Sequence, residues 1–143
     1  MLKETLKEDM KNALKSGNSS RRMLIGMVMA SIKNKELEKR GKLIKTITDS
    51  VQLGAESQLT EQETLDVVAS EVKRRRDSVT EFEKGGRPEL AESERAEAEI
   101  LMTYLPKQMS DDELRALVQK IIASTGATDA KDMGKVMSAL KSE

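Results

Sequence analysis

The sequence predicts an all-α protein, and three observations lead to this prediction. Hydrophobic residues make up 37% of the 143-residue chain and are nearly all aliphatic, since it has one Tyr, one Phe and no Trp. Charged residues make up another 35%, and the Leu, Met, Ala, Glu, Lys and Arg that are common here are strong helix formers. Apolar residues also recur at spacings of three and four along most of the sequence, which is the period of an amphipathic helix.

Two helices are expected first. One covers about residues 2–16, before Gly17, because an apolar residue recurs there every four positions: Leu2, Leu6, Met10 and Leu14. Polar caps beginning with Asn18 open the second, which ends near Gly41. The first half of this helix is apolar nearly all round, through Met23, Ile25, Met27 and Met29. Such a surface is either a central part of the core or covered by a partner.

A long third helix follows an irregular stretch. Residues 42–59 show no sustained period and are expected to form a long loop or a weak helical extension. Thr60 and Glu63 then form a capping box, in which each side chain accepts a hydrogen bond from an orphan backbone N–H. The helix is expected to run from there to Lys84, where a Gly-Gly pair stops it.

A narrow seam on this helix is expected to pack on another helix, because apolar residues follow a seven-residue a/d spacing: Leu65, Val68, Val72, Val79 and Phe82. Arg75 occupies one d position, and Arg76 flanks the seam. Their stems would cover the seam while their guanidinium groups pair with Glu94 or Glu97 of the next helix. Alternatively, these cations meet an external anion.

A fourth helix is expected from Pro88, a residue that suits the first turn, to a stop before Pro106. Its 92–99 stretch is almost all Glu and Ala, and it is expected to face solvent or to form ion pairs.

The pattern restarts beyond Pro106. Ser110 and Glu113 form a second capping box, which opens a helix closed by Gly126 and fully explains the neighbouring carboxylates. A last helix is expected to open near residue 129 or 132 and carries apolar residues at helical spacing: Met133, Val136, Met137 and Leu140. The predicted architecture is therefore an N-terminal helical bundle with a long third helix, residues 1–106, and a small, shortened C-terminal helical tail domain, residues 107–143.

The composition excludes several kinds of chemistry. Without His or Cys the chain can form no Ser-His-Asp triad, thiolate nucleophile, disulfide or ordinary zinc site. We therefore expect no catalytic residue, no metal site and no cofactor. No apolar run is long enough to span a bilayer, and the N-terminal residues do not resemble a signal peptide. A cytoplasmic protein without a membrane partner is expected.

The charges are unevenly distributed although the formal net charge is zero. Residues 1–59 carry 12 basic and 7 acidic side chains, whereas residues 60–143 carry 13 and 18. Such a distribution suits steering toward a charged partner. Arg21 and Arg22 stand in the first turn of the second helix, where the helix dipole disfavours cations. An external phosphate or a nearby carboxylate would relieve this.

The densest basic cluster lies in the third helix and comprises Lys73, Arg74, Arg75 and Arg76. At about 100° per residue its members point in different directions. Whether or not Arg75 and Arg76 cover the seam, Lys73 and Arg74 remain available to an external anion such as an RNA phosphate.

Four motifs occur in a characteristic order: residues 71–78 (EVKRRRDS), 86–92 (GRPELAE), 104–110 (YLPKQMS) and 132–137 (DMGKVM). In these motifs the chain resembles the GatB/YqeY family over nearly its whole length, apart from residues 42–59, which look like an insertion. That family contains stand-alone proteins similar to the C-terminal region of the B subunit of glutamine-dependent aspartyl/glutamyl-tRNA amidotransferase. There the corresponding region is a helical domain plus a small tail domain that helps to hold tRNA, while phosphorylation and amide transfer occur elsewhere.

The resemblance implies a role near tRNA or its amidation machinery, with a family label of carbon–nitrogen ligase activity that uses glutamine as amide donor. It also implies a set of nucleic-acid-binding residues: Lys73, Arg74, Arg75 and Arg76 in the basic helix motif, Gly134 and Lys135 in the tail motif, and Lys131 just before it. Two departures reduce the basic surface. Gly26 and Met29 stand where relatives often have basic residues, and the tail is expected to lack the closing helix of the family.

Three functions are compatible with the sequence. The first is a non-catalytic accessory module associated with tRNA or with tRNA amidation. The second is a helical protein–protein interaction module, which binds a partner or a second copy through the Met-rich part of the second helix. The third is a free-standing amidotransferase, for which the sequence offers no catalytic groups.

Overall fold

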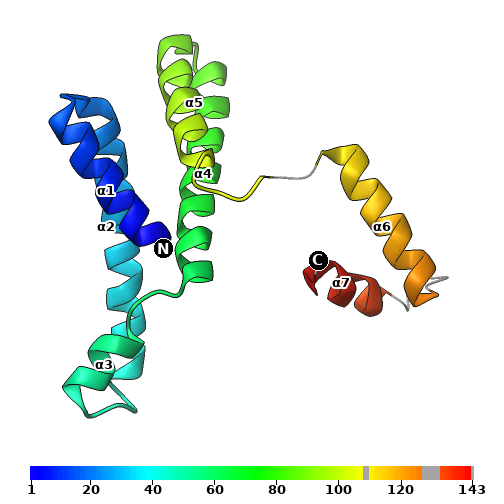
Figure 1. Ribbon diagram of the computed structural model, residues 1–143. Coiled ribbons are helices and arrows are strands. Elements are labelled where there is room, and N and C mark those ends of the chain that lie inside the picture. The colour runs from blue at the N-terminus through cyan, green and yellow to red at the C-terminus, as the bar shows by residue number, and fades with distance from the viewer. Residues whose placement is uncertain (108–109, 127–132, 143) are drawn as a thin grey trace. The chain divides into compact units, whose positions relative to one another are not determined.

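A computed structural model of the chain describes residues 1–107, 110–126 and 133–142, with side chains in the last segment through residue 139. These residues form seven helices and no strand, which confirms the all-α fold class. The chain divides into two compact units, Met1–Leu105 and Pro106–Glu143 (Figure 1). No helix within the described ranges is both long enough and apolar enough to cross a membrane.

The sequence predicts the first two helices, and in the structure they form an antiparallel hairpin (Figure 1). Helix α1 covers Leu2–Lys15 and α2 covers Ser19–Leu43. Gly17 makes the tight connection with φ of +72°, a conformation that costs glycine little, and the Asn18 side chain accepts a hydrogen bond from the Arg21 N–H at 3.0 Å. Gly41 does not end α2, which continues for two further residues.

Helices α4 (Glu61–Lys84) and α5 (Pro88–Met102) form a second hairpin, in which the two run side by side (Figure 1). The Thr60 capping box is present, with Thr60 Oγ1 accepting from the Glu63 N–H at 3.1 Å. The prediction that residues 92–99 only face solvent or form ion pairs is wrong for one face of α5. Ala98 is buried there, because its small side chain lets α5 pack closely on α4.

The core of the first unit forms where α1, α2 and α4 meet the end of α5. Aliphatic side chains from all four helices are fully buried in it: Leu6, Ile25, Val28, Ile32, Val68 and Leu101. Met23 and Met27 lie outside this core and are more than half exposed, so the Met-rich part of α2 is a core element on one side only.

The stretch over residues 42–59 is more ordered than its sequence predicts, since it contains a short helix, α3 (Ser50–Glu56). The Asp49 side chain caps α3 by accepting a hydrogen bond from the Gln52 N–H at 2.7 Å. Leu53 is buried and anchors α3 to the end of α2. A helix of two turns is unstable alone, so this contact is what holds it in place.

The second unit contains helices α6 (Asp111–Thr125) and α7 (Met133–Ser142). The Ser110 capping box and the left-handed Gly126, with φ of +68°, confirm the predicted start and end of α6. The predicted start of the last helix near residue 129 or 132 lies outside the described residues. Ile121 is buried, while several described apolar side chains are exposed in this unit: Leu114, Ile122, Met133 and Met137.

Candidate nucleic-acid interface

The basic cluster of α4 separates into an internal arginine and three exposed cations. Arg75 is 4% exposed, whereas Lys73, Arg74 and Arg76 are all exposed. This separation follows from helix geometry, because neighbouring residues differ by about 100° and α4 is covered by other helices on part of its circumference. Arg75 is thus withdrawn from any external partner.

Arg75 forms the centre of a polar network that joins three helices. Its Nη1 donates to Glu71 Oε2 at 2.7 Å, and its Nε donates to Glu97 Oε2 on α5 at 3.0 Å. Ser31 of α2 donates to the other Glu71 oxygen at 2.9 Å. The expected pairing of Arg75 with Glu97 is confirmed, and the network satisfies every buried polar atom that it contains.

This network holds a carboxylate ionised inside the fold. Burial by itself raises the pKa of Glu71, but the hydrogen bonds from Arg75 and Ser31 and the charges of Arg74 and Arg75 outweigh it. The pKa of Glu71 therefore lies below its ordinary value. Arg75 is accordingly a structural residue, and its role is to compensate Glu71 and to fix α4 against α2 and α5.

The three exposed cations have weak or replaceable partners. Lys73 Nζ lies 2.8 Å from Asp77 Oδ2, one turn away on the surface of α4. Arg74 Nη1 lies 3.3 Å from Glu71 Oε1, whose charge Arg75 already compensates. The exposed Lys73–Asp77 pair contributes about 0–1 kcal/mol, so a phosphate can replace Asp77 at small cost. Glu71 is buried and keeps Arg75 and Ser31 as partners, while the side chain of Arg74 is itself exposed.

The contact that the Arg76 side chain forms differs from the predicted one. Its Nη2 donates to Met102 Sδ at 3.0 Å instead of to Glu94 or Glu97. The predicted pairing fails because Glu97 of α5 pairs with Arg75, while Met102 at the end of α5 presents a thioether to Arg76.

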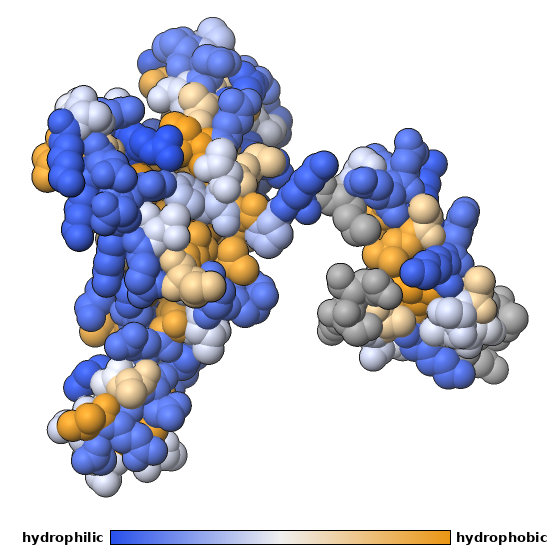
Figure 2. Space-filling model, viewed as in Figure 1, coloured by the Kyte–Doolittle hydropathy of each residue, from blue (hydrophilic) through white to orange (hydrophobic). Residues whose placement is uncertain are grey.

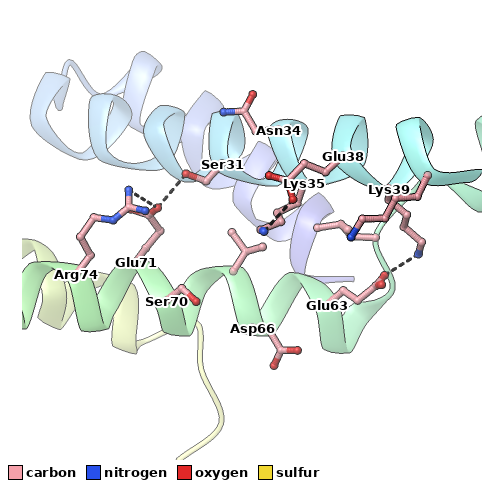
Figure 3. Close-up of a pocket in the computed structure, with 13 residues that line it drawn as sticks. Ser31, Asn34, Lys35, Glu38, Lys39, Glu63, Asp66, Ser70, Glu71 and Arg74 are labelled. Atoms are coloured by element: carbon pink, nitrogen blue, oxygen red, sulfur yellow. Dashed lines mark hydrogen bonds and ion pairs between the residues drawn. The ribbon is translucent and has the colours of Figure 1, made fainter.

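A groove of about 620 Å³ runs between α2 and α4, next to Arg74 (Figure 3). Four cations and four carboxylates line it, the cations being Lys35, Lys39, Lys42 and Arg74, and the carboxylates Glu38, Glu63, Asp66 and Glu71. Most of these charges pair within the groove: Lys39 with Glu63 at 2.8 Å, Lys35 with Glu38 at 3.0 Å, and Arg74 with Glu71.

The groove is therefore close to neutral, and it offers a polyanion little attraction along most of its length. Arg74 lines the groove, whereas Lys73 does not and projects elsewhere from α4. The described residues contain no group of three His, Cys, Asp or Glu side chains that could hold a metal ion.

The tail residues lie in the second unit. Gly134 and Lys135 stand in the first turn of α7, and a Cβ added at Gly134 would meet no atom within 4 Å. An open backbone at this position leaves space for a close approach by a ligand, although it does not demand one. Lys131 lies outside the described residues.

Another group of basic residues was not predicted from the sequence as part of the site. The second half of α2 and the turn after it carry six cations, Lys33, Lys35, Lys39, Arg40, Lys42 and Lys45, against the carboxylates of Glu36 and Glu38. A count of charge over residues 33–45 identifies this segment directly, although its cations are not contiguous in sequence as those of α4 are. For Arg21, the sequence predicts that either a phosphate or a nearby carboxylate relieves the cation at the start of α2. The structure supplies the carboxylate, because Asp9 Oδ2 lies 3.5 Å from Arg21 Nη2.

Comparison with known proteins gives the same family as the four motifs. A family model described as "Yqey-like protein" matches residues 3–143. The chain belongs to the YqeY-like family. The match includes residues 42–59, where α3 lies, as well as the tail motif.

Curated relatives of this YqeY-like protein are fungal and share the printed name "Altered inheritance of mitochondria protein 41, mitochondrial". The protein of Kluyveromyces lactis is 33% identical over 130 residues, which cover 89% of this chain and 59% of the relative. That of Lachancea thermotolerans is 30% identical over 119 residues, covering 82% and 56%. That of Clavispora lusitaniae is 30% identical over 131 residues, covering 90% and 67%. The chain thus spans less than two thirds of the first two relatives, and their names state no ligand or reaction.

Proposed function

We propose that this YqeY-like protein is a non-catalytic accessory module that contacts RNA phosphates, with tRNA or the machinery of glutamine-dependent tRNA amidation as its partner. The observation that carries the proposal is the exposed basic side of α4. Lys73, Arg74 and Arg76 project from one rigid turn, while Arg75 anchors that turn from inside. Rigid placement lowers the entropic cost of binding a phosphate backbone.

The proposed contacts give position along the RNA and not base recognition. Cations that meet phosphates carry no sequence information, and one Tyr and one Phe in the whole chain supply no stacking platform. The tail residues Lys131, Gly134 and Lys135 extend the proposed contact set on the ground of the family resemblance. Cytoplasmic location belongs to the proposal as well, although the relatives above are named as mitochondrial.

Amide transfer is not part of the proposed activity. The family label names a carbon–nitrogen ligase, but a module that positions tRNA for a separate catalytic protein needs no catalytic groups of its own. The proposal thus assigns binding to this chain and chemistry to its partner.

A titration of labelled tRNA at low salt tests the proposal. Replacing two exposed cations, in Lys73→Gln/Arg74→Gln, is expected to weaken binding by about tenfold or more, because each lost phosphate contact removes a counterion-release gain. The matched control, Lys7→Gln/Lys15→Gln, removes the same charge from the exposed side of α1 and is expected to stay within about twofold. Equal weakening by both variants, or no tRNA binding by the natural chain, would refute a specific α4 contact.

A protein–protein interaction module is the second candidate function, and the exposed methionines of α2 favour it. Met23 and Met27 lie one turn apart and expose 68% and 53% of their surface. Methionine adapts its shape to irregular apolar partners, and paired exposed apolar residues are typical of contact surfaces. Sedimentation velocity of the natural chain and of Met23→Gln/Met27→Gln tests self-association. A monomer at all concentrations, together with crosslinking in cells that recovers no protein partner lost in the variant, would remove this candidate.

A further inference from the structure

A second hollow in the first unit lies between α2 and α3, away from the α2–α4 groove. It has a volume of about 320 Å³, and its lining includes Lys3, Lys33, Glu36, Leu37, Arg40 and Gly54. The hollow exists because α3 packs on the end of α2 through Leu53. One side of it is formed by Gly54, Ser57 and Gln58, which fall in the stretch that the sequence predicts as a long loop or a weak helical extension.

The charge in this hollow is predominantly positive. Glu36 is its one carboxylate, and Glu36 is buried, paired with Lys3 and hydrogen-bonded by the Leu59 N–H at 3.4 Å. Lys33 and Arg40 are exposed, and no carboxylate of the described residues lies within ion-pair distance of either. Two cations that form no close ion pair thus border the hollow, and of these Lys33 also acts through its charge on Glu36. Lys45 lies exposed just beyond the end of α2.

Exposed aliphatic side chains surround these cations. Lys33, Leu37, Arg40 and Ile44 follow one another at spacings of four, three and four residues, so they share one face of α2. Leu37 is 54% exposed, Ile44 is 59% exposed, and Val51 at the start of α3 is 79% exposed. Figure 2 shows an apolar patch bordered by hydrophilic side chains at the α3 end of this unit.

We propose that this surface, termed the α2–α3 face and composed of Lys33, Leu37, Arg40, Ile44 and Val51, docks on an anionic lipid bilayer. Its cations meet headgroup phosphates, and its aliphatic side chains enter the boundary between headgroups and acyl chains. Amphipathic surfaces with both features bind membranes peripherally, and each Lys or Arg near an anionic surface adds to the attraction.

A bilayer fits this face better than RNA does. Phosphates alone would satisfy Lys33 and Arg40, but they would leave Leu37, Ile44 and Val51 in water. Lipid buries those side chains as well, which adds the hydrophobic gain to the electrostatic one. The sequence predicts no membrane partner because no segment spans a bilayer, whereas surface docking requires no spanning segment. This inference is independent of the proposed RNA contact.

Co-sedimentation of the full chain with vesicles tests the inference. The two vesicle types are phosphatidylcholine alone and phosphatidylcholine with roughly 30% phosphatidylglycerol, which supplies the negative surface. Binding is expected only to the anionic vesicles and is expected to weaken at high salt. Lys33→Gln/Arg40→Gln is expected to reduce that binding by about tenfold or more, and Ile44→Gln/Val51→Gln by about fivefold or more. All four side chains are exposed, so the fold should survive, which circular dichroism checks.

The control Lys15→Gln/Arg22→Gln removes the same charge at the opposite end of the α1–α2 hairpin and should bind as the natural chain does. Equal binding to neutral and anionic vesicles, or no vesicle binding, would overturn the inference. So would equal losses in the control and in Lys33→Gln/Arg40→Gln. If Lys33→Gln/Arg40→Gln weakened tRNA binding and not vesicle binding, the face would belong to RNA.

Discussion

At the scale of single residues, Arg75 shows how one position in a basic motif can serve the fold while its neighbours remain exposed. Its guanidinium lies between Glu71 of its own helix and Glu97 of α5, with Ser31 of α2 completing the network. Removing one partner of such a buried pair leaves an uncompensated charge, which is more costly than never having had the pair.

Arg75→Ala is therefore expected to lower the free energy of unfolding by about 3–5 kcal/mol. Arg76→Ala, one position along the same helix but exposed, is expected to cost less than about 1 kcal/mol. Urea denaturation followed by circular dichroism measures both. Similar losses in the two variants would mean that Arg75 is not the structural member of the cluster.

The pH dependence of stability should follow from two buried carboxylates. Burial raises the pKa of Glu36, but its bonds with Lys3 and the Leu59 N–H lower the pKa below the ordinary 4.5, and Glu71 behaves likewise. At a pH near these pKa values, Glu36 and Glu71 bind fewer protons in the folded chain than in the unfolded chain. Both ionised carboxylates therefore stabilise the fold above pH 4.5. That contribution is lost as the pH falls through the folded-state pKa.

Urea denaturation between neutral pH and about pH 3 measures this loss. Glu36→Gln/Glu71→Gln is expected to be less stable at neutral pH and to have a flatter profile below pH 4.5. A profile as steep as that of the natural chain would show that other carboxylates dominate.

At the scale of elements, α3 is a helix whose stability depends on its neighbours. It has seven residues, one side-chain cap at Asp49 and one buried apolar side chain, Leu53. Leu53→Ala is expected to melt α3 selectively, because a helix of this length has no stability of its own. Hydrogen exchange should then accelerate in residues 50–56 and stay slow in the centres of α1 and α4. Slow exchange in α3 of the variant would show that Leu53 is not its anchor.

The helices that the sequence predicts well are those with local start and stop signals. Thr60 and Ser110 open α4 and α6, Gly17 and Gly126 end α1 and α6, and each signal acts within a few residues. Helix α3 was missed because its Asp49 cap precedes too short an apolar pattern, and its stability comes from a tertiary contact.

The candidate site was predictable only in part, because some of its contacts are tertiary and leave no local sequence signal. The seam spacing places Arg75 against the next helix and so predicts a contact with Glu94 or Glu97, of which the contact with Glu97 forms. The pairing of Ser31 with Glu71 spans 40 residues and depends on how α2 lies along α4, which no local pattern states. Helical angle alone likewise cannot tell that Arg76 meets Met102.

At the scale of the whole molecule, charge is distributed by element. The second half of α2, residues 31–43, carries five cations against two carboxylates, while α5 carries five carboxylates against one arginine. An overall charge of zero therefore conceals basic surfaces that an anionic partner can find and acidic ones that it avoids. This arrangement limits non-specific coating of nucleic acid and restricts the proposed RNA contact to a few phosphates.

The central claim is that the exposed cations of α4 contact RNA phosphates, and the salt dependence of tRNA affinity tests it most directly. With Lys73, Arg74 and Arg76 each meeting a phosphate, the logarithm of the association constant should fall with the logarithm of salt concentration with a slope of about −2 or steeper. In Lys73→Gln/Arg74→Gln the slope should be shallower by about 1.4–1.8, because two contacts are lost. An affinity that does not change with salt, or the same slope in both proteins, would contradict the account.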